Sequence, residues 1–107
     1  MKYQDRVEAR LHPRFKLDAN LKIRSRTAGQ LSGYAVDISE SGISAMLHIE
    51  VSMGEVVELD FELPLGRVNV RAVVRERNAF RYGFQFVQPN AARQLIAHAC
   101  GSLPPCD

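Results

Sequence analysis

Tryptophan is absent from this 107-residue sequence, and cysteine occurs only twice, at Cys100 and Cys106 near the C-terminus. Because reducing compartments disfavour stable disulfides, we expect two reduced thiols in a frayed tail. The three histidines do not cluster with the cysteines, so no metal site is expected. No Cys-His or Ser-His-Asp constellation stands out either. The chain is therefore not expected to be an enzyme or to carry a cofactor.

Long apolar runs are also missing. No stretch of eighteen apolar residues occurs, which predicts that no helix inserts into a membrane. The N-terminus, from Met1 to Asp5, lacks the apolar core of a signal peptide. These absences favour a cytoplasmic protein. A composition of 46% hydrophobic and 24% charged residues fits a single small globular domain with a core of its own.

Basic and acidic residues are segregated along the chain. Residues 1–26 hold eight Lys or Arg against three acids, and residues 67–93 hold six Arg against Glu76 alone. Residues 37–62 carry seven acids and no Lys or Arg. If the first and last thirds fold against one another, they build a positive face suited to a phosphate-bearing partner. Basic strand faces that are merely solvated are the alternative, and charge alone does not decide between the two.

Alternation of apolar and polar residues predicts β-structure over most of the chain, most clearly from Phe15 to Ile23. In the third expected strand, Ile49 is the last residue predicted to face the core. Short connections and one-sided burial favour an all-β fold, a six-stranded antiparallel β-barrel, because closure removes exposed edges. The six predicted strands span residues 15–24, 31–36, 43–49, 57–63, 68–77 and 82–86.

The end of the sequence changes to a helical period. Apolar residues recur at helical spacing between Pro89 and Cys100, Asn90 can cap the start, and Gly101 is placed to end the helix. A helix of about ten residues is too short to be stable alone. We therefore expect it to lie across the mouth of the barrel.

A polar segment, Asp37-Ile38-Ser39-Glu40-Ser41-Gly42, connects the second and third predicted strands. Asp and Ser favour turns because their side chains bond nearby backbone groups. Gly42 allows a positive φ, which would turn bare N–H groups toward a ligand. Binding residues concentrate on such connections. Taken alone, however, the segment fits an ordinary Asx turn better than a binding site.

Two arginines upstream change that balance, in the segment Arg10-Leu11-His12-Pro13-Arg14. Pro13 disfavours a helix and pushes His12 toward an extended conformation. An extended four-residue step spans about 13 to 14 Å, enough to spread two guanidinium groups around one polyanion. Arginine bonds phosphate and the O6/N7 edge of guanine in bidentate fashion. Residues 1–14 are accordingly predicted to form a flexible basic arm.

Together, Arg-x-x-x-Arg (Arg10 and Arg14), a strand, and Asp-x-Ser-x-x-Gly (Asp37, Ser39 and Gly42) resemble the PilZ domain, a bacterial receptor module for cyclic di-GMP. The resemblance covers nearly the whole chain, because a PilZ domain also ends in a Gly-x-x-Phe-type last strand followed by a short helix. It implies a barrel over residues 15–100 and a tail over residues 101–107.

The resemblance also assigns roles to the motif residues. It places Arg10 and Arg14 on the phosphates and guanine edges of the ligand. Asp37 then makes sense as an acceptor from the N–H donors of the guanine Watson–Crick edge, since a carboxylate would repel phosphate. Ser39 can add a hydroxyl bond, and Gly42 serves the turn.

Arg75 is a further candidate. Many PilZ domains carry a Trp at about this place on the fifth strand, where it packs on a guanine, and this chain has none. A guanidinium plane can stack on a base as well. The hypothesis is that Arg75 forms the stacking platform, against the alternative of a solvated strand arginine.

The function that the resemblance implies is a switch in which cyclic di-GMP draws the arm against the barrel and creates a surface for a downstream protein partner. One alternative is a divergent PilZ-like adaptor that docks a protein without binding the nucleotide. A small nucleic-acid-binding barrel is less favoured, because few aromatics are available for stacking bases and no nucleic acid polymer is expected as partner.

Overall fold

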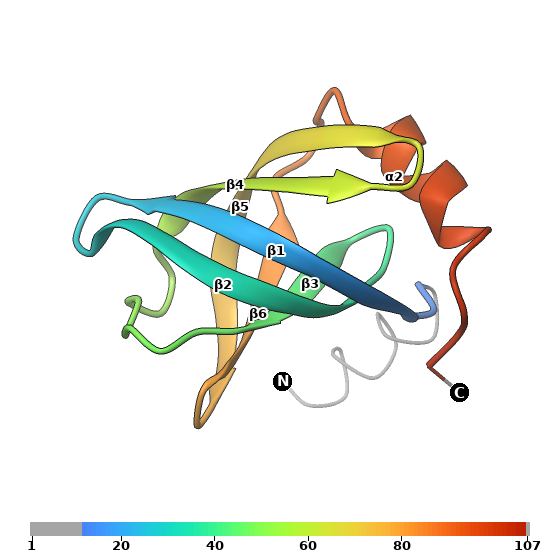
Figure 1. Ribbon diagram of the computed structural model, residues 1–107. Helices are drawn as coiled ribbons and strands as arrows, with labels where there is room; N and C mark the ends of the chain where they lie inside the picture. The colour runs from blue at the N-terminus through green and yellow to red at the C-terminus, as the bar shows by residue number, and fades with distance from the viewer. Residues whose placement is uncertain (1–11, 107) are drawn as a thin grey trace.

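The computed structural model describes residues 12–106, which form six strands and one helix (Figure 1). In chain order these are β1 (Phe15–Ser25), β2 (Gly29–Ile38), β3 (Gly42–Met46), β4 (Val56–Leu63), β5 (Gly66–Asn78), β6 (Arg81–Phe86) and α2 (Arg93–Cys100). All neighbouring strands are antiparallel, and the pairing of β1 with β4 closes the sheet in the order β1-β2-β3-β6-β5-β4. The predicted six-stranded antiparallel barrel with a C-terminal helix is therefore confirmed.

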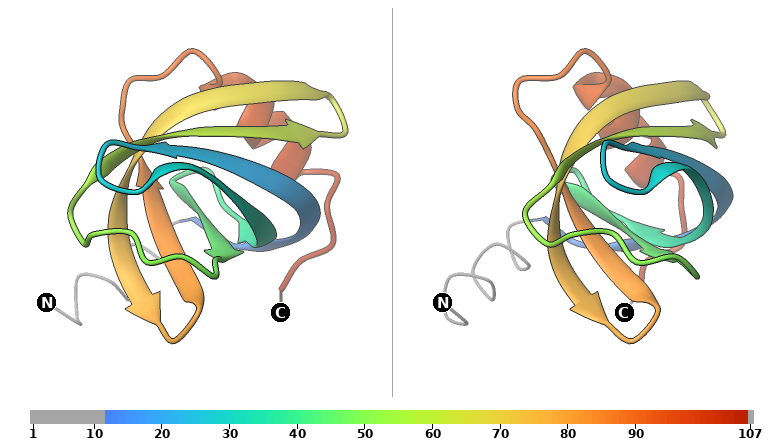
Figure 2. Two further views of the ribbon diagram at one scale, coloured as in Figure 1. Left: turned by 60° about the vertical axis from the view of Figure 1, so that its left-hand side comes forward. Right: turned by 90° about the vertical axis from the view of Figure 1, so that its left-hand side faces the viewer.

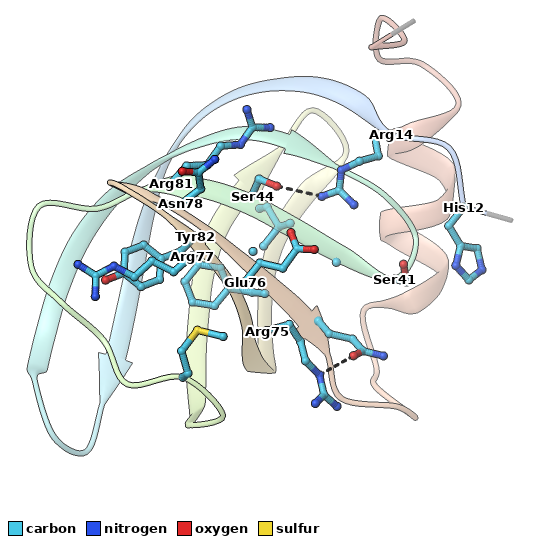
Figure 3. Close-up of a pocket in the computed structure, with 16 residues that line it drawn as sticks. His12, Arg14, Ser41, Ser44, Arg75, Glu76, Arg77, Asn78, Arg81 and Tyr82 are labelled. Atoms are coloured by element: carbon cyan, nitrogen blue, oxygen red, sulfur yellow. Dashed lines mark hydrogen bonds between the residues drawn. The ribbon is translucent and has the colours of Figure 1, made fainter. Parts of the chain in front are cut away.

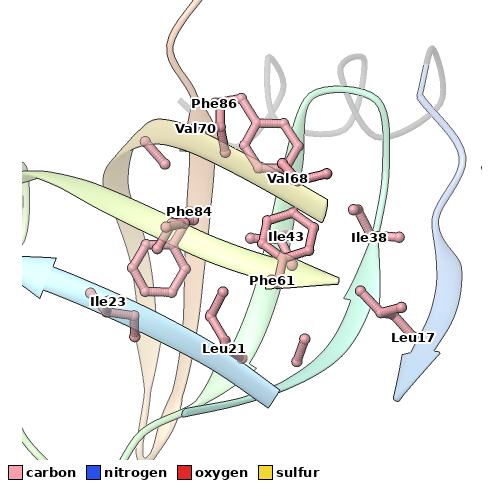
Figure 4. Close-up of a cluster of buried hydrophobic side chains, with 14 of the residues drawn as sticks. Leu17, Leu21, Ile23, Ile38, Ile43, Phe61, Val68, Val70, Phe84 and Phe86 are labelled. Atoms are coloured by element: carbon pink, nitrogen blue, oxygen red, sulfur yellow. The ribbon is translucent and has the colours of Figure 1, made fainter. Parts of the chain in front are cut away.

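Alternate side chains of the strands fill the barrel, as predicted, up to the register shift after Val74 in β5 (Figure 4). The expectation for Ile49 is wrong, because this side chain is 56% exposed. Strand β3 ends at Met46; the N–H of Leu47 still donates to the Phe80 carbonyl at 2.8 Å in the register of the β3–β6 pairing, but residues 47–50 are no longer strand. Beyond that point the period of two no longer decides which way a side chain points, and Val51 enters the core instead of Ile49.

Helix α2 lies against the barrel near the β4–β5 hairpin (Figure 2). The side chain of Leu95 lies over Gly66 of that hairpin. It buries Ile96, Ala99 and Cys100, and this burial raises the pKa of the Cys100 thiol to about 11. The predicted cap is wrong in detail. The amide oxygen of Asn90 accepts from the N–H of Ala92 at 2.9 Å and so fixes the turn before the helix, whereas α2 itself begins after Ala92 without a side-chain cap.

The residues after α2 return to the beginning of β1. The N–H of Lys16 donates to the Pro104 carbonyl at 2.7 Å, and the N–H of Cys106 donates to the Arg14 carbonyl at 3.0 Å. The C-terminal segment of the chain thereby fixes the backbone at Arg14. Among the described residues, no helix has the length and apolar character needed to cross a bilayer.

Candidate ligand-binding site

An open groove of about 1020 Å³ lies over the outer face of β3, β6 and β5. Four arginines line it, Arg14, Arg75, Arg77 and Arg81, and Figure 3 shows them around Glu76. They come from the approach to β1, from the end of β5 and from the start of β6. Cations from three places in the sequence therefore gather on one face, a charge distribution that attracts polyanions.

Asp37 lies beneath the groove and binds two of these arginines. Its side chain is buried, with 5% of the residue exposed. One carboxylate oxygen accepts from Arg14 Nε at 2.7 Å, and the other accepts from Arg81 Nη2. Arg14 Nη2 also donates to Ser44 Oγ at 3.2 Å. The pairing of β2 with β3 shifts register just before Asp37, and such irregularities re-aim a side chain.

The connection from β2 to β3 is held by its own polar groups. Ser39 is fully buried, and its hydroxyl accepts from the N–H groups of Ser41 and Gly42 at 3.2 Å each. Gly42 does not have the predicted positive φ. It is required for space, because a Cβ there would lie 2.3 Å from the Phe84 carbonyl oxygen of β6. Ser39 and Gly42 therefore fix the conformation of the connection that forms one edge of the groove.

Arg75 lies at a β-bulge of β5. The register with β6 shifts between Val74 and Glu76, so three successive residues, 75–77, are exposed along the groove. Arg75 Nε donates to Gln85 Oε1 at 2.8 Å, which lays its side chain across β6. Arg75 is exposed at the groove, and its role as a stacking platform stays a prediction.

Arg77 contacts both a carboxylate and an aromatic ring. Its Nη1 donates to Glu50 Oε2 at 2.7 Å, and its guanidinium carbon lies 5.5 Å from the centre of the Tyr82 ring. The carboxylate and the ring face both favour the cation in this place. Because its guanidinium group already has these partners, we infer that Arg77 mainly contributes positive potential to the groove and does not bind a ligand in bidentate fashion.

The structure brings together part of the predicted site. Arg14, Gly42 and Arg75 line the groove, while Asp37 and Ser39 lie beneath it and do not. Arg10 and most of the predicted arm lie outside the described residues. The described residues contain no group of His, Cys, Asp or Glu side chains placed to hold a metal ion.

Three further residues of the groove, Ser44, Glu76 and Arg81, were not predicted from the sequence. A signal for Arg81 existed, because the buried Tyr82, Phe84 and Phe86 place it on the outer face of the last strand. The sequence did not show that β6 lies beside β3, which brings Arg81 to Asp37.

Residues 6–101 match the family model of the PilZ domain. The PilZ domain of YcgR from Escherichia coli, solved with c-di-GMP, superposes with a TM-score of 0.72 at 14% identity, over 86% of this chain and 88% of that one. The PilZ domain of CeSA from a cellulose-synthesizing bacterium gives a TM-score of 0.63 at 14% identity, over 79% and 90%. The Bacillus subtilis inhibitor of motility, MotI/DgrA, gives 0.68 at 19% identity, over 83% of this chain and 48% of that one. No curated protein gives a significant match.

Proposed function

This chain belongs to the PilZ domain family, and we propose that it is a receptor for cyclic di-GMP. The observation that carries the proposal is the Arg14–Asp37–Arg81 triad at the edge of a groove lined by arginines. Both guanidinium groups are held by a single carboxylate and remain partly exposed, at 36% and 53% of their side chains. A phosphate can therefore bind them from the groove while Asp37 keeps them oriented from below.

The proposed ligand contacts are divided between phosphates and bases. Arg14 and Arg81 bind phosphate, together with Arg10 from the segment outside the described residues. Arg75 stacks on a guanine. Charge-assisted bonds contribute about 1.5 to 3 kcal/mol each, so three or four of them, less the cost of ordering, account for the roughly 8 kcal/mol of a micromolar complex.

Ligand binding is proposed to order the arm over residues 1–14 against the barrel and so to change the surface offered to a downstream protein. The arm joins the barrel at Arg14, whose side chain belongs to the triad and whose carbonyl bonds the C-terminal segment. A phosphate bound to Arg14 would therefore lie at the junction of the arm and the barrel. The domain acts by binding and performs no catalysis.

The test is isothermal titration calorimetry of cyclic di-GMP into the wild type and into Arg14→Ala. We expect saturable binding to the wild type and at least tenfold weaker binding to the variant, because one charge-assisted contact and the pairing of Asp37 are lost. Lys22→Ala, on the outer face of β1 away from the groove, is the matched control and should bind as the wild type does.

The same titration, followed by limited proteolysis, tests the arm. Cleavage within residues 1–14 should slow on addition of cyclic di-GMP in the wild type only. A folded wild type that does not bind would contradict the receptor function and favour the adaptor alternative. Binding that ordinary RNA or GTP competes away would point to a general anion site instead.

A further inference from the structure

Glu76 is the only acid that lines the groove within the described part of the chain. We propose that the carboxylate of Glu76, and not that of Asp37, reads the Watson–Crick edge of a guanine and sets the base specificity of the site. This inference rests on the proposed function, because it names the residue that selects the base once the arginines have bound the phosphates.

Asp37 is poorly placed for that role. Its two oxygens already accept from Arg14 and Arg81, the residue is buried, and it does not line the groove. The two arginines occupy two of the roughly four lone-pair sites of the carboxylate. The other sites are buried with the residue, so to reach a guanine Asp37 would have to move toward the groove and disturb its bonds to the arginines.

Glu76 owes its position to the bulge in β5. Alternation from Val68 through Val74 would point residue 76 into the core, but the register shift after Val74 turns it outward. There it lies opposite Gly83 of β6, and a Cβ on Gly83 would lie 3.2 Å from Glu76 Oε1. The absence of a side chain at Gly83 gives the carboxylate room to lie on the floor of the groove.

The neighbouring arginines do not neutralise Glu76. Arg75 donates to Gln85 and Arg77 donates to Glu50, while Arg14 and Arg81 are both bound to Asp37. Within residues 12–106 the carboxylate of Glu76 makes no hydrogen bond or ion pair. It therefore presents unused acceptors at the centre of a cationic groove, where Figure 3 shows it.

The chemistry of the bases explains why a carboxylate suits this place. An ionised carboxylate only accepts hydrogen bonds, and the guanine edge offers two adjacent donors, N1–H and the 2-amino group. Adenine presents an unprotonated N1 there, so its lone pair would face the carboxylate. Glu76 thus attracts guanine and rejects adenine, while its charge weakens the attraction of the groove for phosphate groups that carry no guanine.

The experiment compares cyclic di-GMP with cyclic di-IMP, the inosine analogue that lacks the 2-amino group, in calorimetric titrations of the wild type, Glu76→Ala and Glu62→Gln. We expect the wild type to bind cyclic di-GMP about tenfold or more tighter than cyclic di-IMP, because that is the weight of one hydrogen bond to a charged group. In Glu76→Ala, affinity for cyclic di-GMP should fall at least tenfold, and the preference between the two ligands should disappear.

Glu62→Gln removes one acidic charge from the exposed face of β4, outside the groove, and should keep both the affinity and the preference. Because Glu76 is exposed, its variant should fold, which circular dichroism checks. Asp37→Asn, titrated with the same two ligands, should keep the preference for guanine even if both affinities fall.

The outcomes separate the two proposals. A wild type that binds neither dinucleotide overturns the receptor function and this inference with it. Binding by the wild type together with unchanged or tighter binding by Glu76→Ala overturns only the role of Glu76, and shows that its carboxylate merely repels phosphate. Loss of the preference in Asp37→Asn but not in Glu76→Ala would return base recognition to Asp37.

Discussion

Strand β2 is flanked by two connections, the β1–β2 turn and the β2–β3 connection, which contain the same residue types but have different roles. At the β1–β2 turn, the Ser25 hydroxyl accepts from the Ala28 N–H at 3.0 Å, and the Glu55 carboxylate accepts from Ser25 Oγ at 2.7 Å. At the β2–β3 connection a serine hydroxyl, Ser39, likewise accepts from backbone N–H groups, and the carboxylate is Asp37. Each connection also has a glycine beside it.

The difference lies in what holds the carboxylate. Glu55 is bound by neutral donors, the hydroxyls of Ser25 and Thr27 and the N–H of Arg26, all within a turn. Asp37 is bound by two arginines that also face a groove. Neutral donors offer an incoming anion little, whereas guanidinium groups can bind carboxylate and phosphate at once. The first arrangement fixes a turn, and the second holds cations ready for a ligand.

The largest effect is expected for the glycines. Gly42→Ala should lower the free energy of unfolding by about 3 kcal/mol, because its Cβ would collide with the Phe84 carbonyl oxygen of a paired strand. Gly29→Ala should cost only about 1 kcal/mol, because nothing lies within 4 Å and only the φ of +79° is unfavourable. Urea unfolding followed by circular dichroism measures both. Equal losses would show that space at β6 is not what Gly42 provides.

A smaller effect is expected for the carboxylate that holds the arginines. Asp37→Asn should lower the free energy of unfolding by about 1 to 2 kcal/mol, because the new amide N–H₂ group faces the donors of an arginine. The figure is moderate since both arginines are partly open to water. Urea denaturation of the two proteins tests it. A variant as stable as the wild type would mean that the triad serves only the ligand.

The smallest effect concerns pH at the other turn. The hydrogen bond from the Ser25 hydroxyl is the main reason that the pKa of Glu55 lies below its ordinary value of 4.5. A carboxyl whose folded pKa is lowered adds stability above its unfolded pKa and loses it as pH falls through the folded pKa. The stability difference between the wild type and Glu55→Gln should therefore be constant from pH 7 to about pH 5.5 and shrink below pH 4.5. Denaturation curves across this range would contradict the account if the difference grew at low pH.

Much of the fold could be predicted because burial imposes a short period on the sequence. Alternation identified all six strands, and the change of period identified the helix. Alternation gave wrong side-chain directions where a strand ends or bulges, because no residue in the sequence indicates where the period changes. Ile49 lies past the end of β3, and Glu76 lies at the β5 bulge.

The sequence alone determined the barrel, the PilZ motifs and the segregation of charge, because these depend on residue type and spacing along the chain. Only the tertiary structure decided which arginine meets which carboxylate. Arg81 reaches Asp37 because β6 pairs with β3, a neighbour that chain order does not reveal. Glu76 enters the groove because an extra residue in β5 reverses the direction of its side chain. Strand order and bulges depend on contacts between residues that are distant in the sequence, so a local sequence pattern does not predict them.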